Sequence, residues 1–568
     1  MQLSRIATIT FVLVSACTSR SSVETTATPS GAFDVVIENG RVVDGTGAAW
    51  YYGDVALRGD RIAAIGPRGA FRNAGAATRV DATGQVVAPG FIDIQAASYS
   101  NYMFGDGKAI SMITQGITTA IHGEGQSPGP MNDKLLAAED DTAAKRVLSG
   151  FTGPHGFSKW LEYMNARGTA QNVGSFMGDG TVRVYAKGTE EGRLSPAELD
   201  TMRAMVVRGM RDGAFGIASA LIYPPNTYAS TEELVEAAKA MAPYGGVYIT
   251  HMRSEGDKFL EAIDEAMRIG REGGVPVEIY HLKASGPRNW PKMPIAIAKI
   301  DSARAAGQDV QANMYLYPAG GNSFASCIPP KYAAGGRLLE NLKNPSLRAT
   351  MLAEMHAIDA GYENLCEIAT PANVMVVGFR KEANKRFEGK RLSEISAALG
   401  KDWAETIIDL NVDEELRLGE LLFLMSEENI RLQLQQPWIK FGTDAASTDP
   451  ATARGMTHPR TYGNFPRLFA RYVREQHVIP LEDAVRKASS AVAARLKITD
   501  RGVLKAGLKA DVIVFDPATI MDNATFENPH KLSTGIRDVF VNGVAVLRNG
   551  QHTGAKPGVV VRGPGYGR

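Results

Sequence analysis

The segment from Val247 to Lys283 constrains the fold of this chain more than any other. Two short runs rich in β-branched and aromatic residues, VYIT and VPVEIY, each stop at a histidine, His251 and His281. The stretch between them, FLEAIDEAMRIGRE, has apolar residues at helical spacing. This pattern predicts strand, helix and strand, with the two strands parallel. The histidines then lie at equivalent ends of neighbouring strands, where two imidazoles can share a metal ion. The alternative is two core histidines hydrogen-bonded to the backbone.

The middle of the chain contains eight candidate strands of this kind. They are VVAPGFIDI, TTAIHG, NVGSFMGD, AFGIASAL, VYITHM, VPVEIYHL, DVQANMYLY and IKFGTDA. Helix-like segments such as TEELVEAAKAMAPYG separate most of them. Eight strands with crossover helices predict an α/β fold, a (β/α)8 barrel. The gap between the last two strands, from Pro318 to Pro437, is too long for one crossover, so we expect an insertion at the barrel mouth.

Both ends of the chain are rich in β-structure. Near the start, FDVVIENGRVVDG and GDVALRGDRIAAIG alternate around Asn-Gly and Gly-Asp turns, and ADVIVFDP and VFVNGVAVLRNG repeat the pattern near the end. We therefore expect one small β-sandwich domain split between residues 31–88 and 500–568. The barrel would occupy residues 89–499, with the insertion within 318–437.

The first 30 residues indicate export. Residues 1–17 combine Arg5, a short apolar run and small residues before Cys17, which resembles a bacterial lipoprotein signal. Residues 18–30 are rich in Ser, Thr and Ala and suit a flexible tether. We expect a periplasmic protein that meets the membrane only through a lipid on Cys17; the alternative is an ordinary signal peptide. Cys327 and Cys366 could pair in an oxidising compartment.

The charge of the chain argues against one class of partner. Its 568 residues carry a net charge of +1 and are 44% hydrophobic. Because no basic run accompanies this near-neutral balance, nothing supports nucleic-acid binding.

Several ordered motifs point to one family. They are PGFID at residues 89–93, DGAFGIASALIYPP, THMRSEGD, HLKASG, THPRTYGNFPRL and GLKADVIVFDP. From about Phe33 onward the chain resembles the amidohydrolase superfamily and, within it, the N-acyl-D-amino-acid deacylase (D-aminoacylase) family. The resemblance implies a metal-bearing barrel with a small β-domain, acting on C–N bonds other than standard peptide bonds.

The expected metal ligands depart from the pattern of that superfamily. A His-x-His pair usually follows the aspartate of the PGFID segment, but Gln95 and Ala97 stand at the matching positions. Glutamine is a poor zinc ligand and alanine has no ligand atom. Near Glu124 the family carries a metal-binding cysteine, which a carboxylate can replace. Glu124, His251 and His281 are therefore the expected ligands of one Zn²⁺ ion, with an open position for water.

Four further residues are assigned through the resemblance. Asp444, in the sequence GTDA, matches the catalytic aspartate and would serve as general acid and base; its alternative role is a helix N-cap. Lys283, Tyr317 and Arg460 match residues that contact the substrate carboxylate, although each could instead be a surface residue or form a structural ion pair.

The expected function is metal-dependent hydrolysis of the amide bond of a small N-acyl amino acid or related amide. The attacking water would be activated by the metal, with Asp444 as general acid and base. One alternative is a dipeptidase, or an amidase whose substrate lacks the carboxylate. Another is a non-catalytic metal-binding periplasmic lipoprotein, since His-x-His is lost. Retention of Glu124, both histidines and Asp444 favours the enzyme.

Overall fold

Eight parallel strands form the core of the molecule in the computed structural model, which describes residues 31–358 and 361–568. The strands are β6 (Phe91–Asp93), β7 (Ile117–His122), β8 (Asn172–Ser175) continued by β9 (Met177–Gly178), β10 (Gly216–Ala220), β11 (Val247–His251), β12 (Val277–Ile279), β13 (Val310–Met314) and β17 (Ile439–Phe441). A parallel bridge between Ala96 and Ala445 joins the first strand to the last and closes the circle. The predicted (β/α)8 barrel is confirmed. The expected signal peptide, tether and Cys17 lie outside the described residues.

The first predicted strand differs from the structure because two sheets share it. Its first half, β5 (Val86–Pro89), pairs with strands of the β-domain, and only β6 belongs to the barrel. Gly90 lies between the halves, where a Cβ atom would come within 2.2 Å of the Thr118 side chain. This close approach lets the chain pass from one sheet to the other without a loop.

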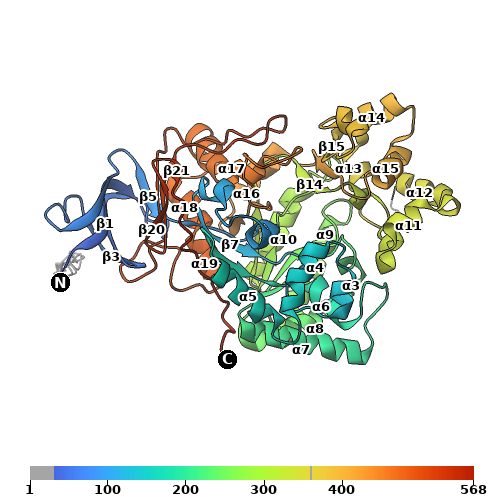
Figure 1. Ribbon diagram of the computed structural model, residues 1–568, viewed down its shortest axis with the longest axis horizontal. Helices are drawn as coiled ribbons and strands as arrows, with labels where there is room; N and C mark the ends of the chain where they lie inside the picture. The colour runs from blue at the N-terminus through green and yellow to red at the C-terminus, as the bar shows by residue number, and fades with distance from the viewer. Residues whose placement is uncertain (1–30, 359–360) are drawn as a thin grey trace, which may run out of the picture.

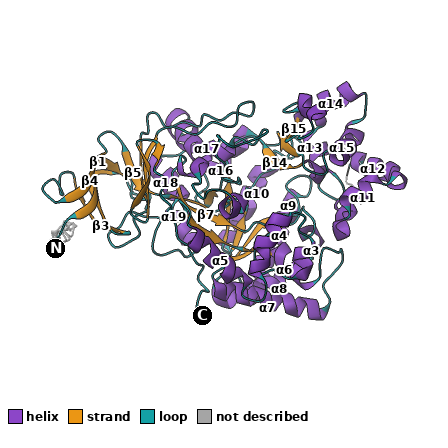
Figure 2. Cartoon of the chain, viewed as in Figure 1, coloured by secondary structure: helices purple, strands orange, loops and turns teal. Residues whose placement is uncertain are grey.

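Amphipathic helices surround the barrel (Figure 2). The principal ones are α5 (Gly156–Arg167), α6 (Asp179–Ala186), α7 (Pro196–Asp212), α8 (Thr231–Met241), α9 (Phe259–Gly273), α10 (Lys292–Ala305), α16 (Glu427–Leu434), α17 (Arg460–Arg467) and α18 (Leu481–Ala488). Helix α9 is the predicted crossover between the two histidines, and its Phe259, Ile263 and Ile269 are fully buried. Within residues 31–358 and 361–568, no helix has the length and apolar character needed to cross a membrane.

The two ends of the chain share one nine-stranded sheet. Its strands are β1 (Phe33–Val42), β2 (Tyr51–Arg58), β3 (Arg61–Pro67), β4 (Ala76–Asp81), β5, β18 (Val512–Phe515), β19 (Ile536–Val541), β20 (Val544–Arg548) and β21 (Gln551–His552). Strand β18 pairs antiparallel with β5, which brings the last strands beside the first, as Figure 1 shows in red and blue. Apolar side chains from both ends, such as Val55 and Val514, pack in one core.

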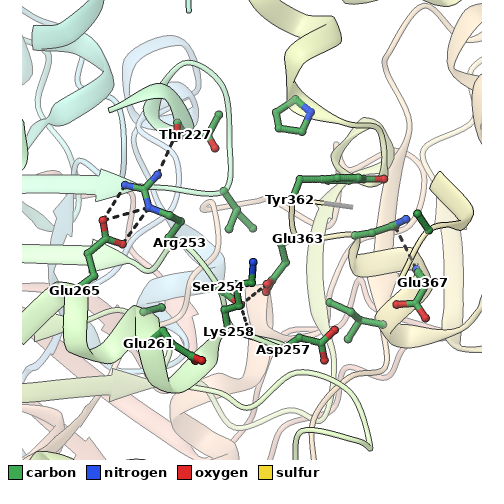
Figure 3. A pocket seen from close by; sticks show the side chains of 17 residues that line it. Thr227, Arg253, Ser254, Asp257, Lys258, Glu261, Glu265, Tyr362, Glu363 and Glu367 are labelled. Atoms are coloured by element: carbon green, nitrogen blue, oxygen red, sulfur yellow. Dashed lines mark hydrogen bonds and ion pairs between the residues drawn. The ribbon is translucent and has the colours of Figure 1, made fainter. Parts of the chain in front are cut away.

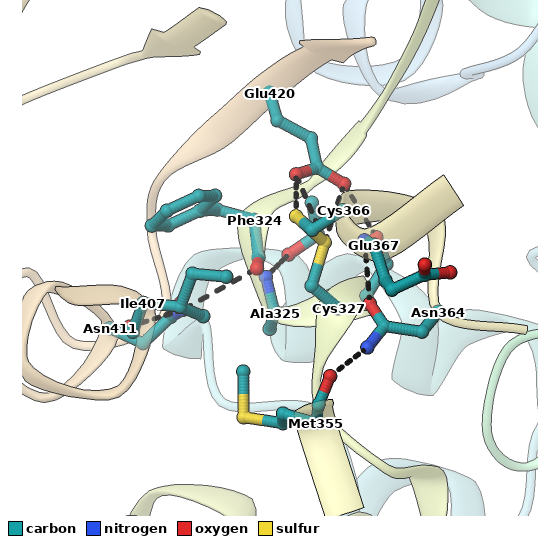
Figure 4. Close-up of a disulfide and its surroundings, with 12 residues drawn as sticks. Phe324, Ala325, Cys327, Met355, Asn364, Cys366, Glu367, Ile407, Asn411 and Glu420 are labelled. Atoms are coloured by element: carbon teal, nitrogen blue, oxygen red, sulfur yellow. Dashed lines mark hydrogen bonds between the residues drawn. A yellow bond between two sulfur atoms is a disulfide. The ribbon is translucent and has the colours of Figure 1, made fainter. Parts of the chain in front are cut away.

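The expected insertion folds as a separate unit with its own apolar core. It contains the antiparallel strands β14 (Gly320–Ser323), β16 (Gly419–Leu422) and β15 (Val374–Val377), in that order, and the helices α11 (Leu338–Lys343), α12 (Pro345–His356), α13 (Leu365–Ala369), α14 (Leu392–Leu399) and α15 (Trp403–Asp413). Cys327 and Cys366 form a disulfide that ties the segment after β14 to α13 (Figure 4). The pairing that the sequence left open is thus resolved.

Candidate metal centre

The three expected ligands converge at the carboxyl ends of the barrel strands. Glu124 follows β7, His251 ends β11 and His281 follows β12. The Glu124 Oε1 atom lies 3.3 Å from His251 Nδ1 and 3.3 Å from His281 Nε2. The three ligand atoms all lie within 4.8 Å of one another. One carboxylate and two imidazoles in this arrangement fit a divalent ion such as zinc.

The electrostatics of Glu124 favour its anionic form. Burial alone would raise the pKa of this carboxyl, but hydrogen bonds from His251 and His281 hold the pKa well below its usual range. A carboxylate that is already ionised needs to lose no proton before it binds a cation.

Glu255 lies behind both histidines. Its place just past His251 predicts that Glu255 supports the ligands as a pair with Arg253, but Arg253 pairs with Glu265. One carboxylate oxygen lies 2.9 Å from His281 Nδ1 and the other 3.8 Å from His251 Nε2. Lys283 Nζ also donates to Glu255 at 2.5 Å. A carboxylate on the outer nitrogen fixes the orientation of a ligating imidazole and makes the imidazole more basic.

The neighbouring Arg253 faces away from the histidines. Its guanidinium forms a bidentate pair with Glu265 and donates to the Thr227 carbonyl, in a separate cavity shown in Figure 3. In the same cavity Glu363, from the insertion, accepts hydrogen bonds from the Ser254 hydroxyl and the Glu255 amide. The insertion therefore holds the backbone from which Glu255 reaches the histidines.

Gln95 contacts Glu124, one of the three candidate ligands, although glutamine itself is a poor zinc ligand. Its Nε2 donates to Glu124 Oε2 at 2.6 Å, which leaves Oε1 of the same carboxylate facing the histidines. Gln95 therefore orients Glu124. Ala97, at the other position where the superfamily has a histidine, lines the cavity that Glu124, His251 and His281 share, and has no ligand atom.

Asp444 follows β17 and lines the cavity that Glu124 and both histidines also line. Its amide donates to the Gln95 carbonyl at 2.8 Å, and its φ of 47° is uncommon for a residue with a side chain. His281 shares this feature, with a φ of 30°. Strained residues of this kind cluster at functional sites, because the surrounding structure holds them there. Burial raises the pKa of Asp444, against the lowering effect of Arg460, whose Nη1 lies 2.8 Å away.

The expected substrate contacts need one correction. Lys283 and Arg460 line the same cavity of about 240 Å³ as Asp444 and the three candidate metal ligands. Tyr317 does not: its hydroxyl donates to Asp522 at 3.2 Å, and the Arg467 guanidinium stacks on its ring. Tyr315 lines the cavity instead, with Arg460 4.5 Å from its ring centre.

Comparison with known proteins agrees with this geometry. The profile of the Amidohydrolase family matches residues 406–547. The D-aminoacylase of Alcaligenes xylosoxydans xylosoxydans is 33% identical to this chain, over 94% of this chain and 98% of the relative. The chain belongs to the D-aminoacylase family. It is thus an amidohydrolase, as its motifs predicted.

Two solved structures of the D-aminoacylase family share the fold. A D-aminoacylase described for its binuclear metal centre has a TM-score of 0.76 and 32% identity, covering 93% of this chain and all of the other. The N-acyl-D-glutamate deacylase of Bordetella bronchiseptica, complexed with zinc and a phosphonate mimic of the tetrahedral intermediate, has a TM-score of 0.75 and 29% identity. It covers 94% of this chain and all of the other.

Proposed function

We propose that this member of the D-aminoacylase family hydrolyses the amide bond of N-acyl amino acids. The observation that carries the proposal is a single cavity lined by both the Glu124–His251–His281 set and the Asp444–Arg460 pair. Relatives about 30% identical over more than 90% of the chain are named D-aminoacylase, N-acyl-D-aspartate deacylase and N-acyl-D-glutamate deacylase.

The residues of the cavity have separable roles. Glu124, His251 and His281 would hold a divalent ion, which would supply Lewis acidity to polarise a carbonyl and make water more acidic. The Asp444 carboxylate accepts the proton of the attacking water and delivers it to the leaving nitrogen. The buried Tyr315 hydroxyl, whose pKa is raised by burial, stays protonated and can donate to the carbonyl oxygen.

The charge of the cavity favours a substrate with a carboxylate. Three carboxylates line it, Glu124, Glu255 and Asp444, against the two cations Lys283 and Arg460. The net charge of these five side chains is −1, and a bound divalent ion would bring it to +1, which would attract an anion. The planar guanidinium of Arg460 suits a carboxylate, which would share it with Asp444.

We infer that the chain holds one zinc ion. Gln95 binds Glu124 and Ala97 has no ligand atom, so a second ion would rest on carboxylates and water alone. Transition metals prefer imidazole or thiolate to such a set.

We also propose that the protein is exported and anchored through a lipid on Cys17, on the strength of the sequence before that cysteine. The substrate would then be met in the periplasm.

The test combines metal content with turnover. Metal is measured by mass spectrometry after dialysis against a mild chelator. Rates are measured on N-acetyl-D- and N-acetyl-L-amino acids, on N-acetyl amines that lack the carboxylate, and on dipeptides. We expect one ion per chain, a preference for the carboxylate substrates, and loss of both metal and rate in His251→Ala but not in the exposed control His356→Ala.

Other outcomes select the alternatives. Equal rates on the amines favour an amidase, hydrolysis of dipeptides alone favours a dipeptidase, and bound metal without turnover favours a binding lipoprotein. Two retained ions per chain, or full activity with none, would overturn the mononuclear site.

A further inference from the structure

Strand β14 is an edge strand that runs along the cavity lined by Glu124, His251 and His281. The insertion sheet has the order β14–β16–β15, so β14 has a neighbour on one side only. All four of its residues, Gly320–Ser323, line that cavity. Side chains alternate between the two faces of a strand. Four consecutive lining residues therefore mean that the cavity follows the edge of β14 and not one of its faces.

The hydrogen-bond pattern shows which main-chain groups point from this edge into the cavity. The Phe324 amide donates to the Leu418 carbonyl and continues the β14–β16 ladder, in which Asn322 lies opposite Glu420. Because alternate residues of a strand point to opposite edges, Gly320 and Asn322 bond to β16, whereas Gly321 and Ser323 direct their N–H and C=O groups away from it. Among the described residues, no group outside this ladder bonds to the Gly321 main chain.

The edge is fixed at both ends. The imidazole of His458 bonds to the Ala319 carbonyl at 2.8 Å, which confirms that the odd-numbered residues face away from β16. Four residues after β14, the Cys327–Cys366 disulfide holds the chain to α13. A strand already held in place loses little conformational entropy when a ligand pairs with it.

The composition of β14 leaves its backbone uncovered. A Cβ atom at Gly320 would meet only the Tyr315 hydroxyl, at 3.3 Å. Tyr315 is 1% exposed, and its hydroxyl has no hydrogen-bond partner of normal geometry among the described residues. A buried polar group of this kind is satisfied by a ligand or by water. It faces the same cavity as the open main chain of Gly321.

We propose that the free edge of β14 is a subsite for an acyl group that itself carries an amide. The substrate class would be a peptidyl or N-acylaminoacyl amino acid, whose acyl part lies extended and whose acyl amide carbonyl accepts a hydrogen bond from the Gly321 N–H. Addition of an extended segment to a sheet edge is a recurring form of peptide recognition. The inference rests on the proposed amide hydrolysis and names the acyl part of its substrate.

The test compares three acyl groups of equal length on one amino acid. Acetylglycyl has an amide N–H and C=O, acetoxyacetyl replaces that N–H by an ester oxygen, and pentanoyl has neither polar group. We expect kcat/KM for acetylglycyl to be roughly 3- to 10-fold above that for pentanoyl, which lacks the carbonyl that accepts from Gly321, with acetoxyacetyl in between because an ester carbonyl is a weaker acceptor than an amide carbonyl.

Two variants locate the effect on β14. Gly321→Pro removes the N–H, so the advantage of acetylglycyl over pentanoyl should shrink by roughly 3- to 10-fold. Gly321→Ala keeps the N–H and should retain that advantage. Hydrolysis of the pentanoyl substrate without any advantage for acetylglycyl in the wild type would overturn the subsite and leave the proposed function intact. No turnover of any of the three would overturn both.

Discussion

Replacement of Gln95 by methionine should weaken metal binding, although Gln95 is not a ligand. The change keeps nearly the same volume but removes the Nε2 donor that lies 2.6 Å from Glu124 Oε2. A hydrogen bond to a charged group is worth about 1.5–3 kcal/mol, which corresponds to roughly 10- to 150-fold in affinity. Partners that orient metal ligands typically contribute about 10- to 100-fold. We therefore expect the zinc Kd of Gln95→Met to rise at least about 10-fold.

The assay is a titration of metal-free protein with zinc in competition with a chelating indicator. Thermal unfolding of the metal-free variant should change little, because methionine also removes the Gln95 Oε1 atom, which is buried without a partner among the described residues. Gln126→Met is the matched control, since Gln126 lies on the loop after β7 with its side chain exposed. A Kd for Gln95→Met within twofold of this control would refute the idea that Gln95 orients Glu124.

Four further changes test other parts of the protein. Asp444→Asn should keep the metal and lose about 10²- to 10⁴-fold in kcat, because the amide cannot accept a proton; a loss of only a few-fold would remove Asp444 from the mechanism. Arg460→Lys should slow carboxylate substrates more than neutral amides in paired kcat/KM measurements, and equal losses would indicate a structural role. The Cys327→Ser, Cys366→Ser double variant should lower the free energy of unfolding by about 2–4 kcal/mol in denaturant titrations, and an unchanged midpoint would contradict this. Cys17→Ser should move the protein from the membrane fraction to the soluble periplasm, and a wild-type protein that is already soluble there would contradict the lipid anchor.

Local sequence patterns were sufficient to predict the barrel and to place His251 and His281 at its mouth, whereas Glu124 was assigned through the family resemblance. The helical spacing between His251 and His281 required parallel strands, and parallel strands place both histidines at the same mouth. Asp444 was likewise assigned through the resemblance. The barrel and the convergence of the two histidines were predictable because strand ends are defined by short-range periodicity, and the barrel then brings equivalent ends together. The lipid anchor on Cys17 stays a prediction.

Contacts between distant segments could be read only from the tertiary structure. Nothing in the sequence indicates that Gln95 bonds to Glu124 or that Glu255 contacts both histidines and not Arg253, since each contact depends on side-chain directions across different strands. The disulfide likewise depends on how the insertion folds.

The two tyrosines after β13 show the physical reason. On a continuing strand, Tyr315 and Tyr317 would point to the same face, so the pattern could not separate them. The strand ends at Met314, and beyond it the two-residue alternation no longer applies. The path of the chain there is set by packing against the insertion and α17. Tyr315 consequently enters the cavity, and Tyr317 turns to Asp522.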